Sequence, residues 1–370
     1  MAVLGAGGTI APAIVRDLAA SEEVIAMRLL DLDLRKAEAV AIEHGADKAQ
    51  AYEVDATSGG LAEQLAGIDV LVNSAAYRIN LEVMEACLDA GVNYMDLGGL
   101  YHVTAKQLEF SPRFEQRGLL ALLGIGSAPG KTNLLAERAR RELGSDPVSI
   151  SVAAAGRDLD PPDGTSFPYA LRTLLDEITL PPMALINGRP EQMKPLQPGP
   201  TLDFGDPIGE AQTIYTLHSE VLLFGPSFGA KNVTFALSLS PRVLEELRGL
   251  VGAGEERVAE LAAEAVPPSP RTVSVHLVIA EGPAGRVRAR SVTGPHEEWG
   301  LGGGIVSTAS PVAAAVRLLA RGQIDATGAL PPEACIDPDA MFAELETRGV
   351  RFDVTRADGA GESLSGKVAT

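Results

Sequence analysis

A glycine-rich turn near the start of the chain has the residue types that bind a diphosphate. Gly5, Gly7 and Gly8 lie between a short apolar run and a helical stretch that begins near Ala11. Backbone N–H groups and the positive end of that helix can hold a pyrophosphate where larger side chains would obstruct it. The match to the dinucleotide-binding pattern is incomplete, because Ile10 occupies the third glycine position. We expect the phosphate contacts to come from Gly5, Gly7, Gly8, Thr9 and Ile10.

A carboxylate at the end of the next predicted strand strengthens this prediction. Asp31 lies 23 residues after the last of these glycines, close to the spacing of about 20 at which an acidic residue binds the adenosine ribose. A carboxylate there repels a 2′-phosphate and favours NAD, while Arg35 and Lys36 could hold that phosphate and would allow NADP. We assign Asp31 and Asp33 to the cofactor site. In the alternative, both only cap the helix that begins near Leu34.

Small or polar residues also stand where the third, fourth and fifth predicted strands end. Ligands of open parallel sheets bind outside the carboxyl ends of the strands, so these positions suit adenine and the nicotinamide ribose. The cofactor contacts expected here are Asp55, Ala56, Asn73, Ser74, Ala75 and Gly98. Asp96, which ends the fifth strand, is predicted to orient a substrate ammonium group or to cap the turn.

The first part of the chain alternates short strands with amphipathic helices, which is typical of a parallel sheet covered by helices on both faces. The strands are predicted at Ala2–Leu4, Val24–Leu30, Ala51–Val54, Val70–Asn73, Val92–Leu97 and Leu119–Leu123. The helices are predicted at Ala11–Ala20, Leu34–His44, Gly60–Leu65, Leu81–Ala90, Thr104–Arg117 and Lys131–Leu143. This order predicts a doubly wound, Rossmann-type α/β domain over residues 1–130. Because the first strand is short for a central one, we expect the natural start to lie upstream.

The pattern changes after Asp146 to longer strands, which predicts an α+β domain with an antiparallel sheet over residues 131–304. These strands are expected at Val148–Ala155, Gln212–Thr216, Asn232–Ser238, Arg271–Ala280 and Arg286–Thr293. Prolines and glycines between Asp158 and Pro207 predict loops around one helix at Tyr169–Ile178. A long amphipathic helix is predicted at Pro241–Glu264.

The last part of the chain contains a helix that is apolar on all sides, predicted at Ile305–Arg321 and therefore expected to be buried. Residues 305–355 are predicted to form C-terminal helices. Residues 356–370 are small, polar and charged without an apolar period, so they are predicted to be a disordered tail.

Composition restricts the partners. The 370 residues carry 31 basic and 49 acidic side chains, a formal net charge of −18, which repels nucleic acid and anionic membrane surfaces. No run reaches the roughly 18 consecutive apolar residues that a membrane helix needs. Two cysteines, Cys87 and Cys335, fit a reducing cytoplasm in which both are buried. No metal-binding pattern is present in the sequence, so we expect no metal and a small-molecule substrate.

Three segments resemble the saccharopine dehydrogenase-like family. They are the glycine loop, the run Asp69–Gly99 and the run Gly124–Ala136, and the later segment Ala313–Ile336 is similar particularly to its lysine 6-dehydrogenase branch. The resemblance implies a nucleotide-binding domain interrupted by an α+β domain, with C-terminal helices returning to the first domain, and a homodimer. It also implies NAD(P)-dependent oxidation of an amine-bearing carbon in a lysine-like amino acid. The sequence departs from the family pattern at Ile10, Ser127 and Asp31, and the last two departures point away from the saccharopine reductases.

The same resemblance suggests three substrate-facing residues. Tyr77 matches a tyrosine of the family motif and is implied to relay a proton or to form a wall of the substrate site; the alternative is a packing tyrosine. Arg172 is similar to the arginine that holds a substrate carboxylate in saccharopine reductases, although it could instead pair with Asp176 one helical turn away. Ser127, in place of the family's usual acidic residue, is expected to contact the substrate.

Two histidines receive different assignments. His218 is a candidate general base, because histidine is the side chain with an unperturbed pKa near neutrality. His276 alternates with apolar residues along its predicted strand, so we expect it on the polar, exposed face.

Three functions agree with these features. The first is an NAD-dependent amino acid dehydrogenase that acts on a terminal amine in lysine metabolism. The second is a reductase that joins an aldehyde to an amine, as carboxynorspermidine-type relatives do. The third is a regulator that binds NAD without turnover, which the incomplete glycine loop would permit.

Overall fold

The computed structural model describes residues 1–357, and the chain divides into two compact units. Unit 1 comprises Met1–Leu134 and Thr293–Arg351, and unit 2 comprises Leu135–Val292 together with the described residues that follow Arg351. The tail predicted from Arg356 is wrong for its first two residues, because strand β16 extends over Val350–Ala357. Residues 358–370 lie outside the described residues.

Unit 1 contains a parallel sheet of seven strands in the order β15-β6-β5-β4-β1-β2-β3, which confirms the Rossmann-type prediction. The strand order reverses between β1 and β4, and dinucleotides bind at such a reversal. The β15 strand pairs with β6 and was not predicted, because its sequence Gly-Ala-Leu contains no β-branched or aromatic residue. The strands are β1 (Ala2–Leu4), β2 (Met27–Asp31), β3 (Ala49–Glu53), β4 (Val70–Asn73), β5 (Asn93–Asp96), β6 (Leu120–Leu122) and β15 (Gly328–Leu330).

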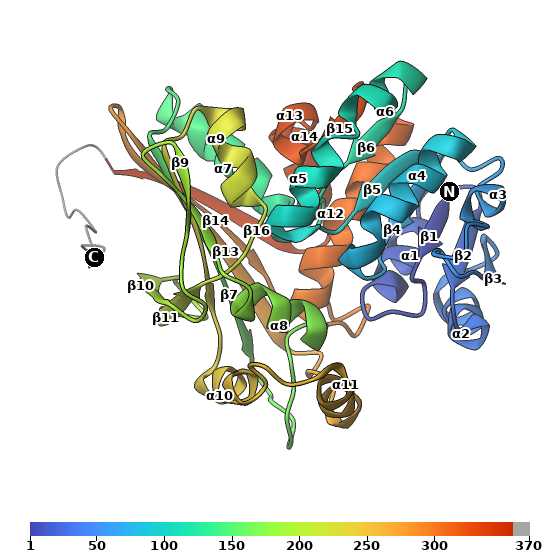
Figure 1. Ribbon diagram of the computed structural model, residues 1–370, viewed down its shortest axis with the longest axis horizontal. Helices are drawn as coiled ribbons and strands as arrows, with labels where there is room; N and C mark the ends of the chain where they lie inside the picture. The colour runs from blue at the N-terminus through green and yellow to red at the C-terminus, as the bar shows by residue number, and fades with distance from the viewer. Residues whose placement is uncertain (358–370) are drawn as a thin grey trace. The chain divides into compact units, whose positions relative to one another are not determined.

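Helices cover both faces of this sheet (Figure 1). On one face α12 (Gly303–Ala320) packs against α1 (Ala11–Ala19) and α14 (Pro338–Glu346), and α1 also packs against α2 (Leu34–His44). The α12 helix has the length and composition of a membrane span, but 72% of its residues are buried within the structure, as expected for a core helix. The remaining helices are α3 (Leu61–Gln64), η1 (Tyr77–Ile79), α4 (Asn80–Ala90), α5 (Leu100–Leu108), α6 (Ser111–Arg117), α7 (Lys131–Leu143) and α13 (Pro332–Cys335).

The single helix predicted at Thr104–Arg117 is two helices in the structure. The chain leaves α5 after Leu108, and α6 begins at Ser111 with Pro112 in its first turn. Proline is tolerated in the first turn of a helix but not in the interior, so it marks the start of a second helix.

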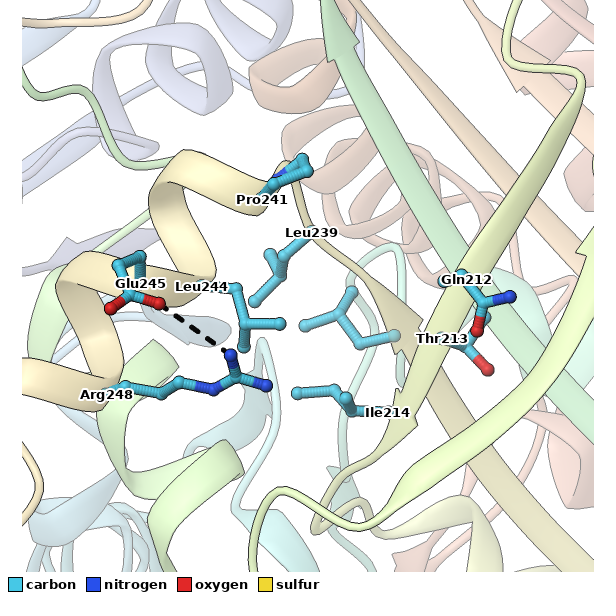
Figure 2. Close-up of a pocket in the computed structure, with 9 residues that line it drawn as sticks. Gln212, Thr213, Ile214, Leu239, Pro241, Leu244, Glu245 and Arg248 are labelled. Atoms are coloured by element: carbon cyan, nitrogen blue, oxygen red, sulfur yellow. Dashed lines mark ion pairs between the residues drawn. The ribbon is translucent and has the colours of Figure 1, made fainter.

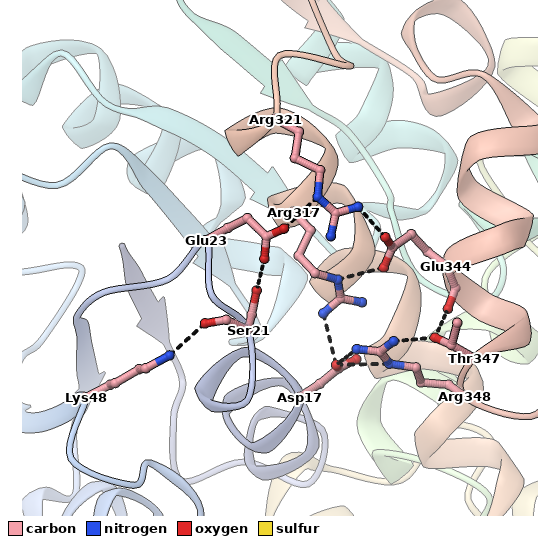
Figure 3. Close-up of polar contacts among 9 residues, drawn as sticks. All are labelled: Asp17, Ser21, Glu23, Lys48, Arg317, Arg321, Glu344, Thr347 and Arg348. Atoms are coloured by element: carbon pink, nitrogen blue, oxygen red, sulfur yellow. Dashed lines mark hydrogen bonds and ion pairs between the residues drawn. The ribbon is translucent and has the colours of Figure 1, made fainter.

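An ion network joins the C-terminal helices of unit 1 to α1. Asp17, 1% exposed, accepts hydrogen bonds from Arg317 Nη1 at 2.9 Å and from Arg348 Nη2 at 2.6 Å (Figure 3). Arg317 also donates to Glu344 at 2.7 Å. Arg321 donates to Glu344 and to Glu23, each at 2.5 Å. Three carboxylates and three guanidinium groups balance in this network.

Unit 2 contains a nine-stranded sheet along the path β10-β11-β12-β7-β13-β14-β16, with β8 and β9 off it. The predicted antiparallel sheet is therefore mixed: β12 pairs with β7 in parallel, while β7 with β13 and β11 with β12 are antiparallel. The remaining strands are β7 (Ser149–Asp158), β8 (Met183–Ile186), β9 (Arg189–Gln192), β10 (Pro198–Asp203), β11 (Glu210–Tyr215), β12 (Asn232–Ser238), β13 (Thr272–Gly282) and β14 (Gly285–Thr293).

The helices of unit 2 show where local patterns fail. The helix predicted at Pro241–Glu264 is interrupted between Gly249 and Glu255, where Gly252 adopts a φ of +80° that a helix cannot accommodate. The segment predicted as loops holds β8, β9 and β10 as well as the expected helix. The helices are α8 (Leu171–Thr179), α9 (Glu220–Phe228), α10 (Pro241–Gly249) and α11 (Glu255–Glu264).

The expected exposure of His276 is wrong. The side chain is 3% exposed on β13, and Val278 and Ala280 on the same face are also buried. Both faces of this strand are covered, so alternation of residue types did not separate an inner from an outer face.

Candidate functional site

The glycine loop has the close packing that a phosphate-binding turn requires. Gly5 has a φ of +73°, and a Cβ on it would come within 2.8 Å of Ala75 after β4. A Cβ on Gly7 would come within 2.6 Å of the Lys36 Cβ. Ile10 is the N-cap of α1 and offers no side-chain cap. The first-turn amides of α1 therefore remain suited to an anion, and the residues present fit the diphosphate of a dinucleotide.

Asp31 and Asp33 have different local roles. Asp31 Oδ2 accepts a hydrogen bond from Gly7 N at 2.8 Å, which holds this carboxylate beside the glycine loop. Asp33 instead caps α2, because its Oδ1 accepts hydrogen bonds from Arg35 N at 3.1 Å and Lys36 N at 3.4 Å. The capping alternative therefore describes Asp33, whereas Asp31 occupies the position expected for a ribose ligand.

Asp55 and Ala56 follow β3 at the adenine side of the sheet. Asp55 is exposed, and its Oδ1 accepts hydrogen bonds from Thr57 N at 2.8 Å and Thr57 Oγ1 at 2.7 Å. These bonds lower the pKa of the Asp55 carboxyl, so it is ionised at neutral pH. An adenine contact of Asp55 stays a prediction.

On the other half of the sheet, polar side chains after β4 and β5 form one buried network. Asn73 Oδ1 accepts from Ala75 N at 3.1 Å, and Asn73 Nδ2 donates to Asn80 Oδ1 at 2.9 Å. Asn80 Nδ2 in turn donates to Asp96 Oδ2 at 3.1 Å. Asn73 and Asp96 are each 1% exposed. The network joins the turn after β4 to the end of β5, while Ser74 contributes a backbone bond to Leu4 at 2.9 Å.

Asp96 is the centre of this network. Its Oδ1 accepts from Gly98 N at 2.9 Å and Gly124 N at 2.6 Å, and its Oδ2 also accepts from Gln107 Nε2 at 2.6 Å and Tyr94 OH at 2.9 Å. Burial raises the pKa of the Asp96 carboxyl, and the hydrogen bonds oppose this rise. A direct contact of Asp96 with a substrate ammonium stays a prediction, and its carboxylate already accepts five hydrogen bonds within unit 1.

The loop after β6 carries the predicted Ser127 and leads to a lysine that the sequence reasoning missed. Thr308 Oγ1 donates to Ser127 Oγ at 3.3 Å. Lys131, in the first turn of α7, is fully buried, and its Nζ donates to Ser307 Oγ at 2.5 Å and Thr293 Oγ1 at 3.2 Å. Burial lowers the pKa of Lys131 to about 7. A lysine directly after Pro-Gly at a helix start was the available signal.

In unit 2, His218 lies between two buried carboxylates. Its Nε2 is 3.6 Å from Glu177 Oε2, its Nδ1 is 3.4 Å from Glu220 Oε2, and its ring stacks on Phe235 with centroids 3.6 Å apart. Tyr169 OH donates to Glu177 as well. Burial alone would lower the pKa of His218, but the two carboxylates outweigh it and raise the pKa to about 9. At neutral pH His218 therefore carries a proton that it can donate.

Arg172 joins the same region of unit 2. Its Nη2 lies 3.1 Å from Asp176 Oδ1 on α8, which is the ion pair weighed from the sequence. Tyr77, in unit 1, is half-buried in η1, and the Arg78 guanidinium lies 5.9 Å from its ring centroid. The structure thus brings Asn73, Asp96 and Gly98 together in unit 1, and Arg172 and His218 onto or beside α8 in unit 2.

A cavity of about 230 Å³ in unit 2 contains none of the predicted site residues. Apolar side chains of β11, β12 and α10 form its walls, and Arg248 lies 3.7 Å from Glu245 at its edge (Figure 2). Both of those charged side chains are more than half exposed. The lining residues are Gln212, Thr213, Ile214, Leu237, Leu239, Pro241, Leu244, Glu245 and Arg248.

Comparison with known sequences finds similarity for the amino-terminal part of the chain. Residues 1–122 match the family model described as the saccharopine dehydrogenase NADP binding domain. Carboxyaminopropylagmatine dehydrogenase of Synechocystis sp. is 30% identical over 141 residues, which are 36% of this chain and 35% of that protein. Carboxynorspermidine synthase of Vibrio cholerae is 29% identical over 94 residues, 23% of either chain. The alignments thus span about a third or less of these curated relatives.

Comparison with solved structures concerns the whole chain. Saccharopine dehydrogenase (L-Glu forming) from Saccharomyces cerevisiae superposes with a TM-score of 0.70 at 17% identity, covering 96% of this chain and 99% of that one. Homospermidine synthase from Legionella pneumophila, solved with NAD, gives 0.74 at 12% identity, covering 100% and 94%. The fold is that of saccharopine dehydrogenase. The expected lysine 6-dehydrogenase branch and a role in lysine metabolism are not supported, because the curated relatives carry other names.

Proposed function

We propose that this protein is an NAD(P)-dependent oxidoreductase that joins an aldehyde to an amine, because residues 1–122 match the family model of the saccharopine dehydrogenase NADP binding domain. The aldehyde and the primary amine lose water to form an imine, which takes up a hydride and a proton to become a secondary amine. The names of the two curated relatives support this reaction over oxidation of a terminal amine. A cytoplasmic homodimer remains the expected context.

The cofactor site carries the proposal. The uncapped start of α1, the glycine loop and the Asp31 carboxylate held against Gly7 would bind the diphosphate and the adenosine ribose. The nicotinamide, when bound, supplies the hydride. The Asp31 carboxylate favours NAD, because it repels a 2′-phosphate. Arg35 is 93% exposed, so it remains available to NADP.

The protonated His218 supports the reductive direction. Loss of water from the carbinolamine and uptake of hydride by the imine both require a proton donor. The raised pKa of His218, about 9, keeps the imidazole protonated at neutral pH. We therefore propose His218 as the acid of the condensation and Tyr77 as a second candidate for proton relay.

Turnover and binding should be measured separately. Reduced cofactor is mixed with an amino acid semialdehyde and a panel of amines that includes agmatine and diamines, and the loss of reduced nicotinamide absorbance is followed. Oxidised cofactor with lysine, saccharopine or ornithine tests the opposite direction. Consumption of reduced cofactor that requires both aldehyde and amine supports the proposal. Reduction of oxidised cofactor with lysine alone would instead indicate an amino acid dehydrogenase. Cofactor binding by calorimetry without any turnover would favour a regulator.

Arg172 provides a test at the level of one residue. If it holds a substrate carboxylate, Arg172→Ala should raise KM for the carboxylate-bearing substrate about tenfold, since the contact is made to substrate only. The dissociation constant of the cofactor should not change. An unchanged KM would leave Arg172 as the partner of Asp176 alone.

A further inference from the structure

Asp96 combines deep burial with an unusual set of partners. The carboxylate is 1% exposed and accepts five hydrogen bonds, all from neutral groups: the amides of Gly98 and Gly124 and the side chains of Asn80, Tyr94 and Gln107. The largest influences on its pKa are burial and its hydrogen bonds, and none of the five donors carries a charge. The carboxylate is therefore held by neutral groups.

The donor set indicates that Asp96 is ionised. Two carboxylate oxygens offer about four lone-pair sites, and five donors already form hydrogen bonds with them. A proton on Oδ1 would have no acceptor, because Gly98 N and Gly124 N only donate, and a proton on Oδ2 would require the Tyr94 hydroxyl or a side-chain amide to turn and accept it. The ionised form uses all five donors as they stand. Burying a negative charge that has no cation among its hydrogen-bond partners costs folding free energy. Such charges are concentrated at functional sites, which suggests that Asp96 has a functional role.

The position of Asp96 suggests that function. It ends β5, on the side of the sheet opposite to β2 and β3, where Asp31 marks the adenosine half. Dinucleotides bind across the reversal of strand order, with their two halves on opposite sides of it. The nicotinamide half belongs with β4, β5 and β6. Through Gly98, Gly124 and Asn80, the Asp96 carboxylate holds the chain that follows each of these three strands.

The nicotinamide ring is positively charged when oxidised and neutral when reduced. A fixed negative charge on this half of the sheet stabilises the first form more than the second. We propose that Asp96 is a positioning residue that sets the three nicotinamide-side turns and whose charge makes unit 1 bind the oxidised cofactor in preference to the reduced one. This inference rests on the proposed cofactor site of unit 1, but it is independent of which amine or aldehyde reacts.

The test is the ratio of two dissociation constants, measured by calorimetry with NAD and with NADH in the absence of substrate. Asp96→Asn should weaken NAD relative to NADH by about three- to tenfold. Gln107→Lys places a cation against the intact carboxylate and should shift the ratio in the same direction, which keeps the test available if Asp96→Asn does not fold. Tyr94→Phe removes a donor without changing charge, so both constants should change together and the ratio should stay as in the wild type.

Each outcome has one reading. A ratio that moves in Asp96→Asn and Gln107→Lys but not in Tyr94→Phe supports the inference. A ratio unchanged within about twofold in both charge-changing variants overturns it, even if catalysis is lost, because a purely structural role would weaken both cofactor forms alike. If the wild type binds none of NAD, NADH, NADP and NADPH, the proposed function itself fails, and this result is separate from the result on Asp96; if it binds only the 2′-phosphorylated pair, the same ratio is measured with NADP and NADPH.

Discussion

Asp17 and Asp96 are buried to the same degree in unit 1, yet the fold treats them in opposite ways. Asp17 accepts its hydrogen bonds from Arg317 and Arg348 within a charge-balanced network that fastens α12 and α14 to α1 (Figure 3). Asp96 accepts only from neutral donors at the carboxyl edge of the sheet. The comparison indicates that balanced charges serve the assembly of the unit, whereas the unbalanced charge lies where a ligand is expected.

Two buried basic side chains also differ in whether a carboxylate lies beside them. His218 lies between Glu177 and Glu220, which raise its pKa to about 9 in spite of burial. Within residues 1–357, the hydrogen-bond partners of the Lys131 ammonium are two hydroxyl groups, and burial lowers the pKa of Lys131 to about 7. A buried cation with carboxylates beside it thus keeps its proton, and one without them gives it up near neutrality.

The largest effect is expected from breaking the balanced network. Arg317→Met leaves Asp17 with one arginine and removes a partner of Glu344, so the free energy of unfolding should fall by about 3 kcal/mol. Urea denaturation followed by circular dichroism measures this. Arg321→Met is the control: that side chain is 39% exposed, solvent screens its ion pairs, and the loss should be about 0.5 kcal/mol. Equal losses in the two variants would remove the distinction between buried and exposed pairs.

His218 should make stability fall as the pH rises. Because the folded pKa of about 9 exceeds the reference value of 6.5, its stabilisation is complete below pH 6.5 and is lost as the pH passes through about 9. The loss across this window should be about 2.5 kcal/mol in the wild type and absent in His218→Gln. Denaturation at a series of pH values measures it, with the exposed His102→Gln as control. A slope that survives in His218→Gln would assign it to other groups.

Lys131 should give the opposite slope. The unfolded chain holds the lysine proton up to about pH 10.5, whereas the folded protein releases it near pH 7, so stability rises with pH between these values. Over the part of this range between pH 7 and pH 9 we expect a gain of about 2 kcal/mol, which Lys131→Met abolishes. The same denaturation series serves, and the exposed Lys106→Met should keep the gain. A wild type whose stability is flat after correction for His218 would contradict a neutral Lys131.

The smallest change in stability is expected at Asp96. Asp96→Asn loses hydrogen bonds but also removes the cost of a buried charge, so the free energy of unfolding should fall by only about 1 kcal/mol. Asp17→Asn should cost more, since it leaves Arg317 and Arg348 facing a neutral group. Urea denaturation of the two variants side by side compares them. A larger loss at Asp96 than at Asp17 would reverse the comparison drawn above.

Local patterns were sufficient for much of unit 1. The helix Leu34–His44 and the strand Val70–Asn73 were predicted with their observed bounds, because an amphipathic stripe and a fully apolar run are read within one segment. The turn at Gly5 and the carboxylate of Asp31 were predicted for the same reason. Patterns that depend on a short stretch of chain were accessible, including the end of a helix and the carboxyl end of a strand.

Features that depend on contacts between residues distant in the sequence could not be predicted. The parallel pairing of β7 with β12 joins strands about 80 residues apart, and no hairpin turn between them indicates the pairing in the sequence. The roles of Asp96 and Lys131 follow from donors on several other segments, so a lone aspartate or lysine in the sequence gave no sign of its surroundings. Asp96 was singled out by its place at a strand end, whereas its set of neutral partners required the structure.

The pairing of Asp17 with Arg317 also has a consequence for how the protein is made. These residues are 300 positions apart, and Arg348 is 331 positions from the same aspartate. At ribosomal speeds of about 5–20 residues per second, Asp17 leaves the ribosome roughly 15–60 seconds before its first arginine. All of Leu135–Val292 is synthesised in that interval. The nascent amino-terminal part must therefore wait for the last segment of the chain before its own interior can be completed.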